Sequence, residues 1–145
     1  MSTKFVPGAA DREPIAIIGI GCRFPGDVDG PESFWRLLET GRDAITEIPT
    51  DRFEVDAYYD PTPATPGKIM SRWGGFISGI DRFDAAAFGI SPREAERLDP
   101  QQRLLLEVSA EALADAGLST ERLAGSQTGV FVGVWLSDYE ARLFE

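Results

Sequence analysis

The 145-residue sequence predicts an α/β fold, and three observations support this prediction. Two apolar runs, "PIAIIGI" at residues 14–20 and "TGVFVGVW" at 128–135, have the nearly continuous apolar character of strands that are buried on both faces. Helix start signals, each followed by apolar residues at helical spacing, lie between the two runs. Strands that alternate with helices in this way are typical of layered α/β proteins with crossover connections.

Proline and glycine delimit the first elements. The polar residues 1–13 predict a flexible N-terminal lead, and the run at 14–20 predicts a central strand. After a loop rich in Gly, Pro and Asp, "PESFWRLLETG" at 31–41 predicts a helix, because Pro31 suits a first turn and Gly41 suits a helix end. One apolar stripe of this helix consists of Phe34, Trp35, Leu37 and Leu38.

The middle of the chain predicts irregular structure followed by two helices. Prolines interrupt residues 42–83, where only 72–77 suggests a short strand. Helices are predicted at 91–98 and 99–117, because each begins with Ser or Asp, then Pro, then Glu or Gln three residues after the cap. The wide apolar stripe of the second predicts that it is mostly buried. A further helix is expected to begin at 137–144, after the second strand.

Composition and charge exclude several classes of partner. The chain has 14 basic and 24 acidic residues, and its net charge of −10 argues against binding to nucleic acid or to an anionic membrane surface. A single cysteine allows no internal disulfide, which fits a reducing cytosol. No apolar run approaches the ~20 residues of a membrane span, and residues 1–13 lack the apolar region of a signal peptide. We therefore expect a cytosolic protein.

The absence of histidine is the most restrictive feature of the composition. Serine and cysteine hydrolases of the triad type use an imidazole as base, and zinc enzymes usually use one as ligand. A lone cysteine cannot form a thiolate metal site. We therefore expect no metal site and no complete catalytic set within these residues.

The stretch "IAIIGIGCRFPG" at 15–26 admits two functional interpretations, and neither is favoured. A dinucleotide-binding fingerprint needs G-x-G-x-x-G followed directly by a helix, but Phe24 stands at the third glycine position and a loop follows. Cys22 as a nucleophile would need a nearby base, and the chain has no histidine. The glycines are better explained by a sharp exit from a buried strand, and Cys22 by a half-buried structural position.

A family resemblance indicates a specific fold and activity, which composition alone does not. The blocks "EPIAIIGIGCRFPG", "FWRLLETGRDAITEIPTDRF", "YYDP", "PGKIMSRWGGFI", "FDAAAFGISPREAERLDPQQRLLLEVSAEALADAG" and "TGVFVGV…DY" resemble, in order and spacing, the N-terminal part of the β-ketoacyl synthase (ketosynthase) domain of modular type I polyketide synthases. The resemblance covers about residues 13–145. It implies the N-terminal part of a thiolase-type α/β/α/β/α fold, which works as a homodimer.

The resemblance also implies an activity, a carrier and a set of partners. Ketosynthases transfer an acyl chain from an acyl carrier protein to a cysteine and condense it with a malonyl-type extender, with loss of carbon dioxide. The phosphopantetheine arm of the carrier delivers both substrates, so no cofactor is expected on the chain itself. Expected partners are the acyl carrier protein, the rest of the ketosynthase and an adjoining acyltransferase domain.

The family's catalytic residues are not expected among these 145 residues. The nucleophile lies in a "T-A-C-S-S" motif that comes later than "FVGV…DY", and two histidines follow it, whereas Cys22 matches the "G-x-G-C-R-F-P-G" opening. We therefore expect residues 14–145 to be a ketosynthase portion that is truncated before the catalytic cysteine and inactive alone. Gly133, Val134 and Trp135 are expected to approach the acyl pocket. The alternative is a non-catalytic interaction module, or a truncated relic, that pairs with a complementary half.

Overall fold

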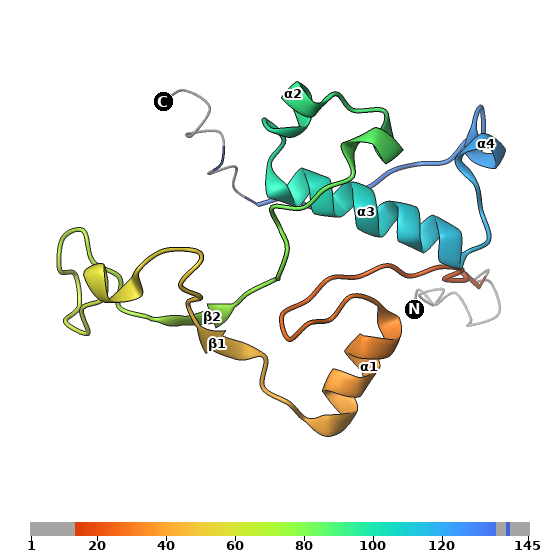
Figure 1. Cartoon of the computed structure of the whole chain (residues 1–145). Coiled ribbons are helices and arrows are strands. Elements are labelled where there is room, and N and C mark those ends of the chain that lie inside the picture. The colour runs from red at the N-terminus through yellow and green to blue at the C-terminus, as the bar shows by residue number, and fades with distance from the viewer. Residues whose placement is uncertain (1–13, 136–138, 140–145) are drawn as a thin grey trace, which may run out of the picture.

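The computed structural model describes residues 14–135 and Tyr139 (Figure 1). The predicted lead at 1–13 lies outside the described residues, as does the predicted helix at 137–144 except for Tyr139. In chain order the elements are α1 (Pro31–Thr40), β1 (Ile45–Glu47), η2 (Val55–Ala57), β2 (Trp73–Gly75), η3 (Ala85–Phe88), α2 (Pro92–Ala95), α3 (Pro100–Asp115) and α4 (Thr120–Leu123).

The helix start signals are confirmed for α2 and α3. The Ser91 hydroxyl accepts a hydrogen bond from the Glu94 N–H at 3.3 Å, with Pro92 in the first turn of α2. The Asp99 carboxylate accepts from the N–H of Gln101 at 2.8 Å, one residue earlier than the predicted capping box would place the bond. Both caps satisfy an N–H group that has no partner within the helix.

The first predicted helix is also confirmed, and glycine ends it. Gly41 adopts φ 60°, in the left-handed region that favours glycine, and its N–H bonds to Leu38 O at 3.1 Å. The next N–H, of Arg42, bonds to Leu37 O at 3.3 Å. The chain thus turns sharply away from α1 toward β1.

β1 and β2 form a two-stranded antiparallel sheet, in which Ile45 pairs with Gly75 and Glu47 with Trp73. The predicted strand at 72–77 contains β2, whereas β1 lies in a region predicted to be irregular. We call residues 45–75 the arm, because the segment between the two strands extends away from α1 and α3 (Figure 1). A single bridge between Tyr59 and Ile69 closes this segment.

The expectation that the two apolar runs form buried strands is wrong for the described chain. Residues 14–20 and 128–135 have no strand ladder, and side chains such as Ile15 and Phe131, each 95% exposed, face solvent. A strand exists only through hydrogen bonds to a neighbouring strand, and no other described segment pairs with either run.

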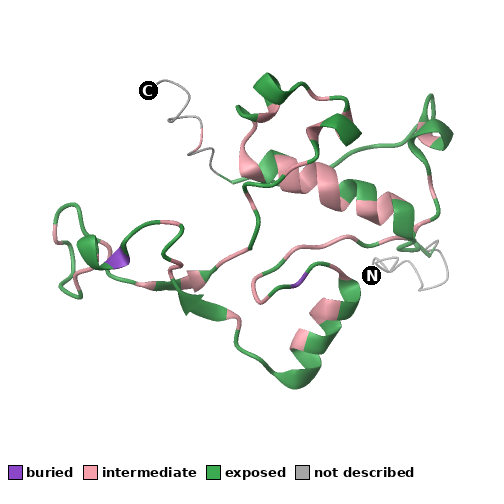
Figure 2. Ribbon diagram, viewed as in Figure 1, coloured by how far each residue is buried: buried purple, intermediate pink, exposed green. Residues whose placement is uncertain are grey.

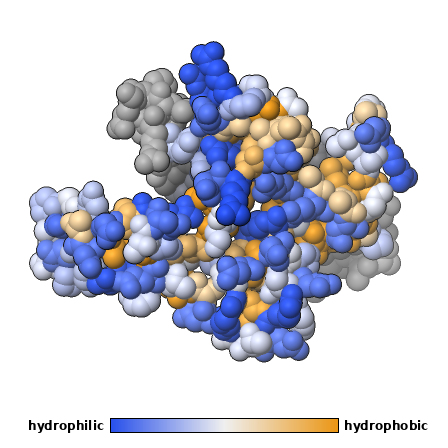
Figure 3. Space-filling model, in the orientation of Figure 1, coloured by the Kyte–Doolittle hydropathy of each residue, from blue (hydrophilic) through white to orange (hydrophobic). Residues whose placement is uncertain are grey.

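Helix α3 is half-buried rather than mostly buried, and its less exposed residues cluster along part of its surface (Figure 2). Among the described residues only Val28 and Val55 are buried apolar side chains, and neither is fully buried. Apolar patches are accordingly visible on the surface of the molecule (Figure 3). The described residues therefore form a layer with apolar surface left uncovered.

Candidate functional site

The glycines of the opening stretch bring the backbone into direct contact with α3. A Cβ atom at Gly19 would lie 2.1 Å from Ala112 O, and one at Gly21 would lie 2.2 Å from Val108 O. Real Cβ atoms do not approach backbone oxygens so closely, so only glycine fits at both positions. The predicted exit turn is made by Gly26, with φ +88°, whereas Gly19 and Gly21 serve close packing on the helix.

This packing agrees with the interpretation that the stretch is not a dinucleotide site. The backbone at Gly19 and Gly21 faces the backbone of α3 rather than an open cradle. The chain then passes through a bridge between Phe24 and Val28, and the next helix begins only at Pro31. No helix N-terminus follows the glycines closely enough to receive a pyrophosphate.

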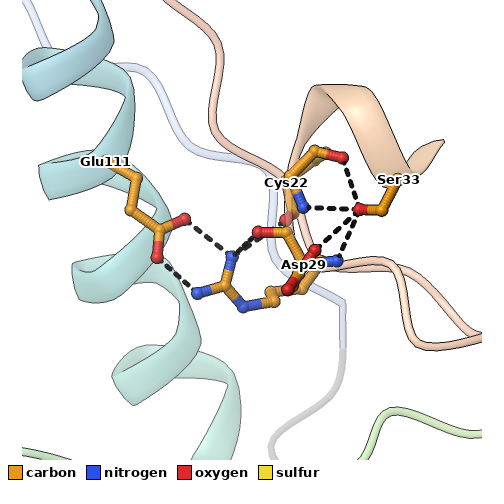
Figure 4. A network of polar contacts seen from close by, with 6 residues as sticks. Cys22, Asp29, Ser33 and Glu111 are labelled. Carbon is orange, nitrogen blue, oxygen red and sulfur yellow. Dashed lines mark hydrogen bonds and ion pairs between the residues drawn. The ribbon is translucent and has the colours of Figure 1, made fainter. Parts of the chain in front are cut away.

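One guanidinium fastens the loop after the first apolar run to α3 (Figure 4). Arg23 forms a two-point ion pair with Glu111, in which Nη1 donates to Oε2 at 2.7 Å and Nη2 donates to Oε1. Arg23 Nη1 also lies 2.7 Å from Asp29 O and 3.1 Å from Cys22 O. We call this group the arginine latch. The hydrogen bond to Glu111 is the main cause that raises the pKa of Arg23, so the guanidinium stays protonated.

A second group of contacts orders the start of α1 beside the latch (Figure 4). The Ser33 hydroxyl lies 2.7 Å from Asp29 Oδ1 and accepts from the N–H of Gly30 at 3.1 Å. The bond from Ser33 lowers the pKa of Asp29 below its usual value of 3.8. The Asp29 carbonyl oxygen also accepts a hydrogen bond from Arg23. Through Asp29 and Arg23, the loop before α1 therefore links the start of α1 to Glu111 on α3.

The first apolar run has one further contact with α3. The N–H of Ile20 donates to Asp115 Oδ2 at 2.9 Å, near the C-terminal end of the helix. Residues 19–23 therefore follow α3 backward, from Ala116 toward Val108. The carboxylates of Glu111 and Asp115 are engaged with Arg23 and with the Ile20 N–H, so these contacts hold the backbone of the first apolar run in place.

Cys22 lies inside this arrangement as a half-buried free thiol. Its carbonyl oxygen accepts from Arg23, and the guanidinium is directed toward Glu111 rather than toward the sulfur. Among the described residues no group of three or more His, Cys, Asp or Glu could hold a metal ion. Nor does any helix within the described ranges have the length and apolarity to cross a membrane.

The predicted pocket residues lie at the exposed end of the second apolar run. Val134 is 62% exposed and Trp135 84% exposed, and a Cβ added at Gly133 would meet no atom within 4 Å. The structure does not bring them together with the arginine latch. The acyl pocket at these residues stays a prediction.

A second polar network, which the sequence analysis missed, ties the two legs of the arm together. Arg72 pairs with Glu47 on β1 and with Asp56 of η2, the latter at 2.9 Å, and its guanidinium lies 5.1 Å from the ring centroid of Tyr59. Desolvation opposes the charged form of Arg72, but the bond to Glu47 and the nearby carboxylates raise its pKa overall. The available signal was the pair of opposite charges at Glu47, which ends β1, and Arg72, which precedes β2.

Comparisons with known proteins identify the family. The family model described as "Beta-ketoacyl synthase, N-terminal domain" matches residues 12–145. One component protein of the phenolphthiocerol/phthiocerol polyketide synthase of Mycobacterium tuberculosis is 54% identical over 134 residues, which are 92% of this chain and 9% of that protein. The phenolphthiocerol synthesis polyketide synthase type I Pks15/1 of Mycobacterium marinum is 52% identical over 128 residues, covering 88% of this chain and 6% of that protein.

Solved structures give the same result. The oxazolomycin ketosynthase domain OzmH KS7 of Streptomyces albus JA3453 matches with a TM-score of 0.80 and 42% identity, over 86% of this chain and 21% of that one. The module 6 ketosynthase of the bacillaene synthase of Bacillus subtilis 168 matches with a TM-score of 0.65 and 40% identity, over 70% of this chain and 17% of that one.

These matches confirm the predicted fold class, an α/β portion of a thiolase-type ketosynthase. The chain spans less than a tenth of the two mycobacterial relatives and about a fifth of the solved ketosynthase domains. The latch residues Arg23 and Glu111 lie within the matched range. On the match of residues 12–145, this chain belongs to the β-ketoacyl synthase family, as part of its N-terminal domain.

Proposed function

We propose that this chain forms the N-terminal part of a ketosynthase in a modular type I polyketide synthase. The observation that carries the proposal is the family match over residues 12–145, together with 54% identity to a mycobacterial polyketide synthase. The complete enzyme would perform a decarboxylative Claisen condensation between an acyl chain and a malonyl-type extender, both carried by acyl carrier protein.

The proposed reaction has two balanced steps. A cysteine thiol of the complete domain attacks the acyl thioester of the carrier, and the phosphopantetheine thiol is released. The malonyl-type thioester then loses carbon dioxide, and the electron pair left behind attacks the acyl carbonyl, so that the enzyme cysteine departs as a thiolate. The product is a β-ketoacyl thioester on the carrier.

We assign no catalytic residue to this chain. It contains no histidine, and its one cysteine, Cys22, is half-buried and offers its carbonyl oxygen to Arg23 of the arginine latch. The contribution that we propose for residues 19–23 is structural: the latch and the glycine contacts hold the first apolar run on α3. The 145-residue chain alone is expected to be inactive.

The acyl pocket is proposed to include Gly133, Val134 and Trp135. Their support is the resemblance and their accessible position at the end of the second apolar run. In the complete ketosynthase, Trp135→Ala should change the ratio of kcat/KM between short and long acyl chains. Trp35→Ala, which removes another exposed indole from α1, should leave that ratio unchanged.

The proposed partners are the acyl carrier protein, the remainder of the ketosynthase and an adjoining acyltransferase domain, in a cytosolic homodimer. The test compares the complete domain with the purified 145-residue chain. Each is incubated with acyl and malonyl carrier thioesters, and the carrier is weighed by mass spectrometry. We expect condensation with the complete domain and none with the 145-residue chain. A folded complete domain that accepts no acyl group would refute the proposed function.

One observation favours a second candidate, a non-catalytic module that pairs with a complementary half. Both apolar runs expose large side chains, including Ile15, Ile17, Phe131 and Trp135, to a degree that marks an interaction surface. Co-expression with the remaining part of a ketosynthase separates the candidates. A stable complex without condensation supports the module, and a complex that condenses substrates supports the enzyme.

A further inference from the structure

Tyr139 fastens the chain beyond the second apolar run to the junction of α2 and α3. Its hydroxyl donates to Glu96 O, 43 residues earlier, at 3.1 Å. The guanidinium carbon of Arg103, in α3, lies 5.9 Å from the centroid of its ring, a distance at which a cation attracts an aromatic face. Tyr139 is half-buried. The chain is therefore held close to the beginning of α3 shortly after the second run ends.

The two residues that hold Tyr139, Glu96 and Arg103, also line a hollow of about 350 Å³. Half-buried apolar side chains form part of its wall, namely Phe83, Ala85 and Ala95. Asp81, Pro92 and Glu96 are exposed at its rim, so the hollow is open to a side chain that arrives from outside. Neither rim carboxylate lies within 4.0 Å of a cationic group in the described part of the chain.

The sequence around Tyr139 is that of an amphipathic helix. Ser137 and Glu140 have the spacing of a capping box, in agreement with the helix predicted at 137–144. In such a helix, the residues three and four positions after Tyr139 lie on the same face one turn later. These residues are Arg142 and Leu143, a cation and a large apolar side chain.

This segment and the hollow match in position and in chemistry. Because Tyr139 contacts two residues of the hollow, a side chain one turn later, about 5.4 Å along the helix, is within reach of it. Leu143 suits the apolar wall, and Arg142 supplies the positive charge that the rim carboxylates lack. A side chain tethered in this way also has a higher effective concentration at the hollow than a separate partner has.

We propose that residues 137–144 dock at this hollow as a helix, in which Tyr139 is the anchor, Leu143 fills the hollow and Arg142 pairs with Glu96. Glu96 is the partner of Arg142 because its own carbonyl oxygen accepts from the anchor. Docking holds the end of the second apolar run, since Trp135 precedes the helix by only two residues. The inference concerns contacts within residues 81–144 and does not depend on condensation activity.

Site-specific photocrosslinking in the complete ketosynthase domain tests the docking directly. With p-benzoylphenylalanine in place of Leu143, we expect a crosslink to residues 83–95, identified by mass spectrometry after digestion. The matched control carries the same probe in place of Ala141, which lies on the opposite face of the helix and should not crosslink there. A crosslink from position 143 to another part of the polypeptide, or equal yields from both positions, would overturn the proposal.

Charge reversal tests the ion pair between Arg142 and Glu96. Arg142→Glu and Glu96→Arg should each lower the thermal midpoint of the complete domain by about 1–2 °C, because each brings two like charges together. The double variant should recover most of that loss. Glu94→Arg, at an exposed position on the other side of α2, is the control, and its effect should add to that of Arg142→Glu. Additive effects at Glu96 as well would contradict the pairing.

Other occupants of the hollow give different outcomes. An experimental structure of the complete domain in which the hollow holds a side chain from beyond residue 145, or from a second protein chain, would show that the proposal is wrong. A domain that crosslinks as expected but does not condense carrier thioesters would instead refute the proposed function and leave the docking of residues 137–144 intact.

Discussion

The contact between the first apolar run and α3 is held in a different way from the arm. Along α3 the backbone of Gly19 and Gly21 touches the helix backbone directly, and the arginine latch closes the contact. In the arm, the charged side chain of Arg72 links Glu47 on β1 to Asp56 of η2. The contact on α3 depends on glycines without side chains as well as on one ion pair, whereas the arm contact depends on charged side chains. The two regions should therefore respond differently to substitution, salt and pH.

The largest effect is expected from Gly19→Ala in the complete domain. The new Cβ would meet Ala112 O at 2.1 Å, so the first apolar run would have to move away from α3. Overpacking of this kind lowers the free energy of unfolding by up to about 3 kcal/mol. Chemical denaturation measures the change.

Gly30→Ala is the control for that experiment, because no atom lies within 4 Å of the added Cβ and its φ of 177° suits any residue. A loss of less than about 1 kcal/mol is expected, since Gly30 is a helix cap. Equal losses at Gly19 and Gly30 would contradict the close approach of the two backbones.

The arginine latch should give the next largest effect. Glu111→Gln removes the charge that faces Arg23, and a loss of about 1 kcal/mol is expected, because the pair is partly exposed, with 22% of the Arg23 side chain and 41% of the Glu111 side chain accessible. A double-mutant cycle with Arg23→Met measures the coupling. Additive losses would show that the two side chains do not interact in the domain.

Salt should separate the two regions more clearly. The carboxylates of the arm network, and Asp56 above all, are more exposed than Glu111, and the Debye length falls to about 3 Å at 1 M salt. Hydrogen exchange between β1 and β2 should therefore quicken in high salt, and in Arg72→Met at low salt. Amides at 19–23 should change less in both conditions. Equal acceleration in both regions would contradict the distinction.

The smallest effect concerns pH at the start of α1. Because the pKa of Asp29 is lowered in the folded state, its contribution to stability is present above the unfolded value of about 3.8 and is lost as pH falls through the lower folded value. Ser33→Ala removes the main cause of the lowering. Denaturation of both proteins at pH 7 and at pH 2 should show a difference at pH 7 that shrinks in acid. A difference that does not depend on pH would mean that Ser33 acts only through the Gly30 N–H.

The local elements were predictable wherever the signal is local. Pro31 with Gly41, Ser91 with Pro92, and Asp99 with Pro100 mark helix ends through bonds made within a few residues. The pairing of β1 with β2 was predictable only in part, because it joins Glu47 to Trp73 across a long segment. The latch was not predictable, since nothing local relates Arg23 to Glu111, 88 residues later.

The two apolar runs show that a strong local signal can also mislead. Their composition predicted strands, but a run forms a strand only when a neighbour accepts its hydrogen bonds, and the described residues supply none. The glycines show the same dependence on context: their presence indicated a turn, and only the position of α3 revealed that Gly19 and Gly21 allow two backbones to touch.

The sequence by itself therefore determined where α1, α2 and α3 begin, the absence of histidine and, through its motif blocks, the ketosynthase family. The tertiary structure alone decided which charges pair, namely Arg23 with Glu111 and Arg72 with Glu47 and Asp56. The physical reason is the separation along the chain between the groups that interact. Caps and turns are satisfied by atoms a few residues away, whereas ion pairs and backbone contacts depend on where distant segments meet in space.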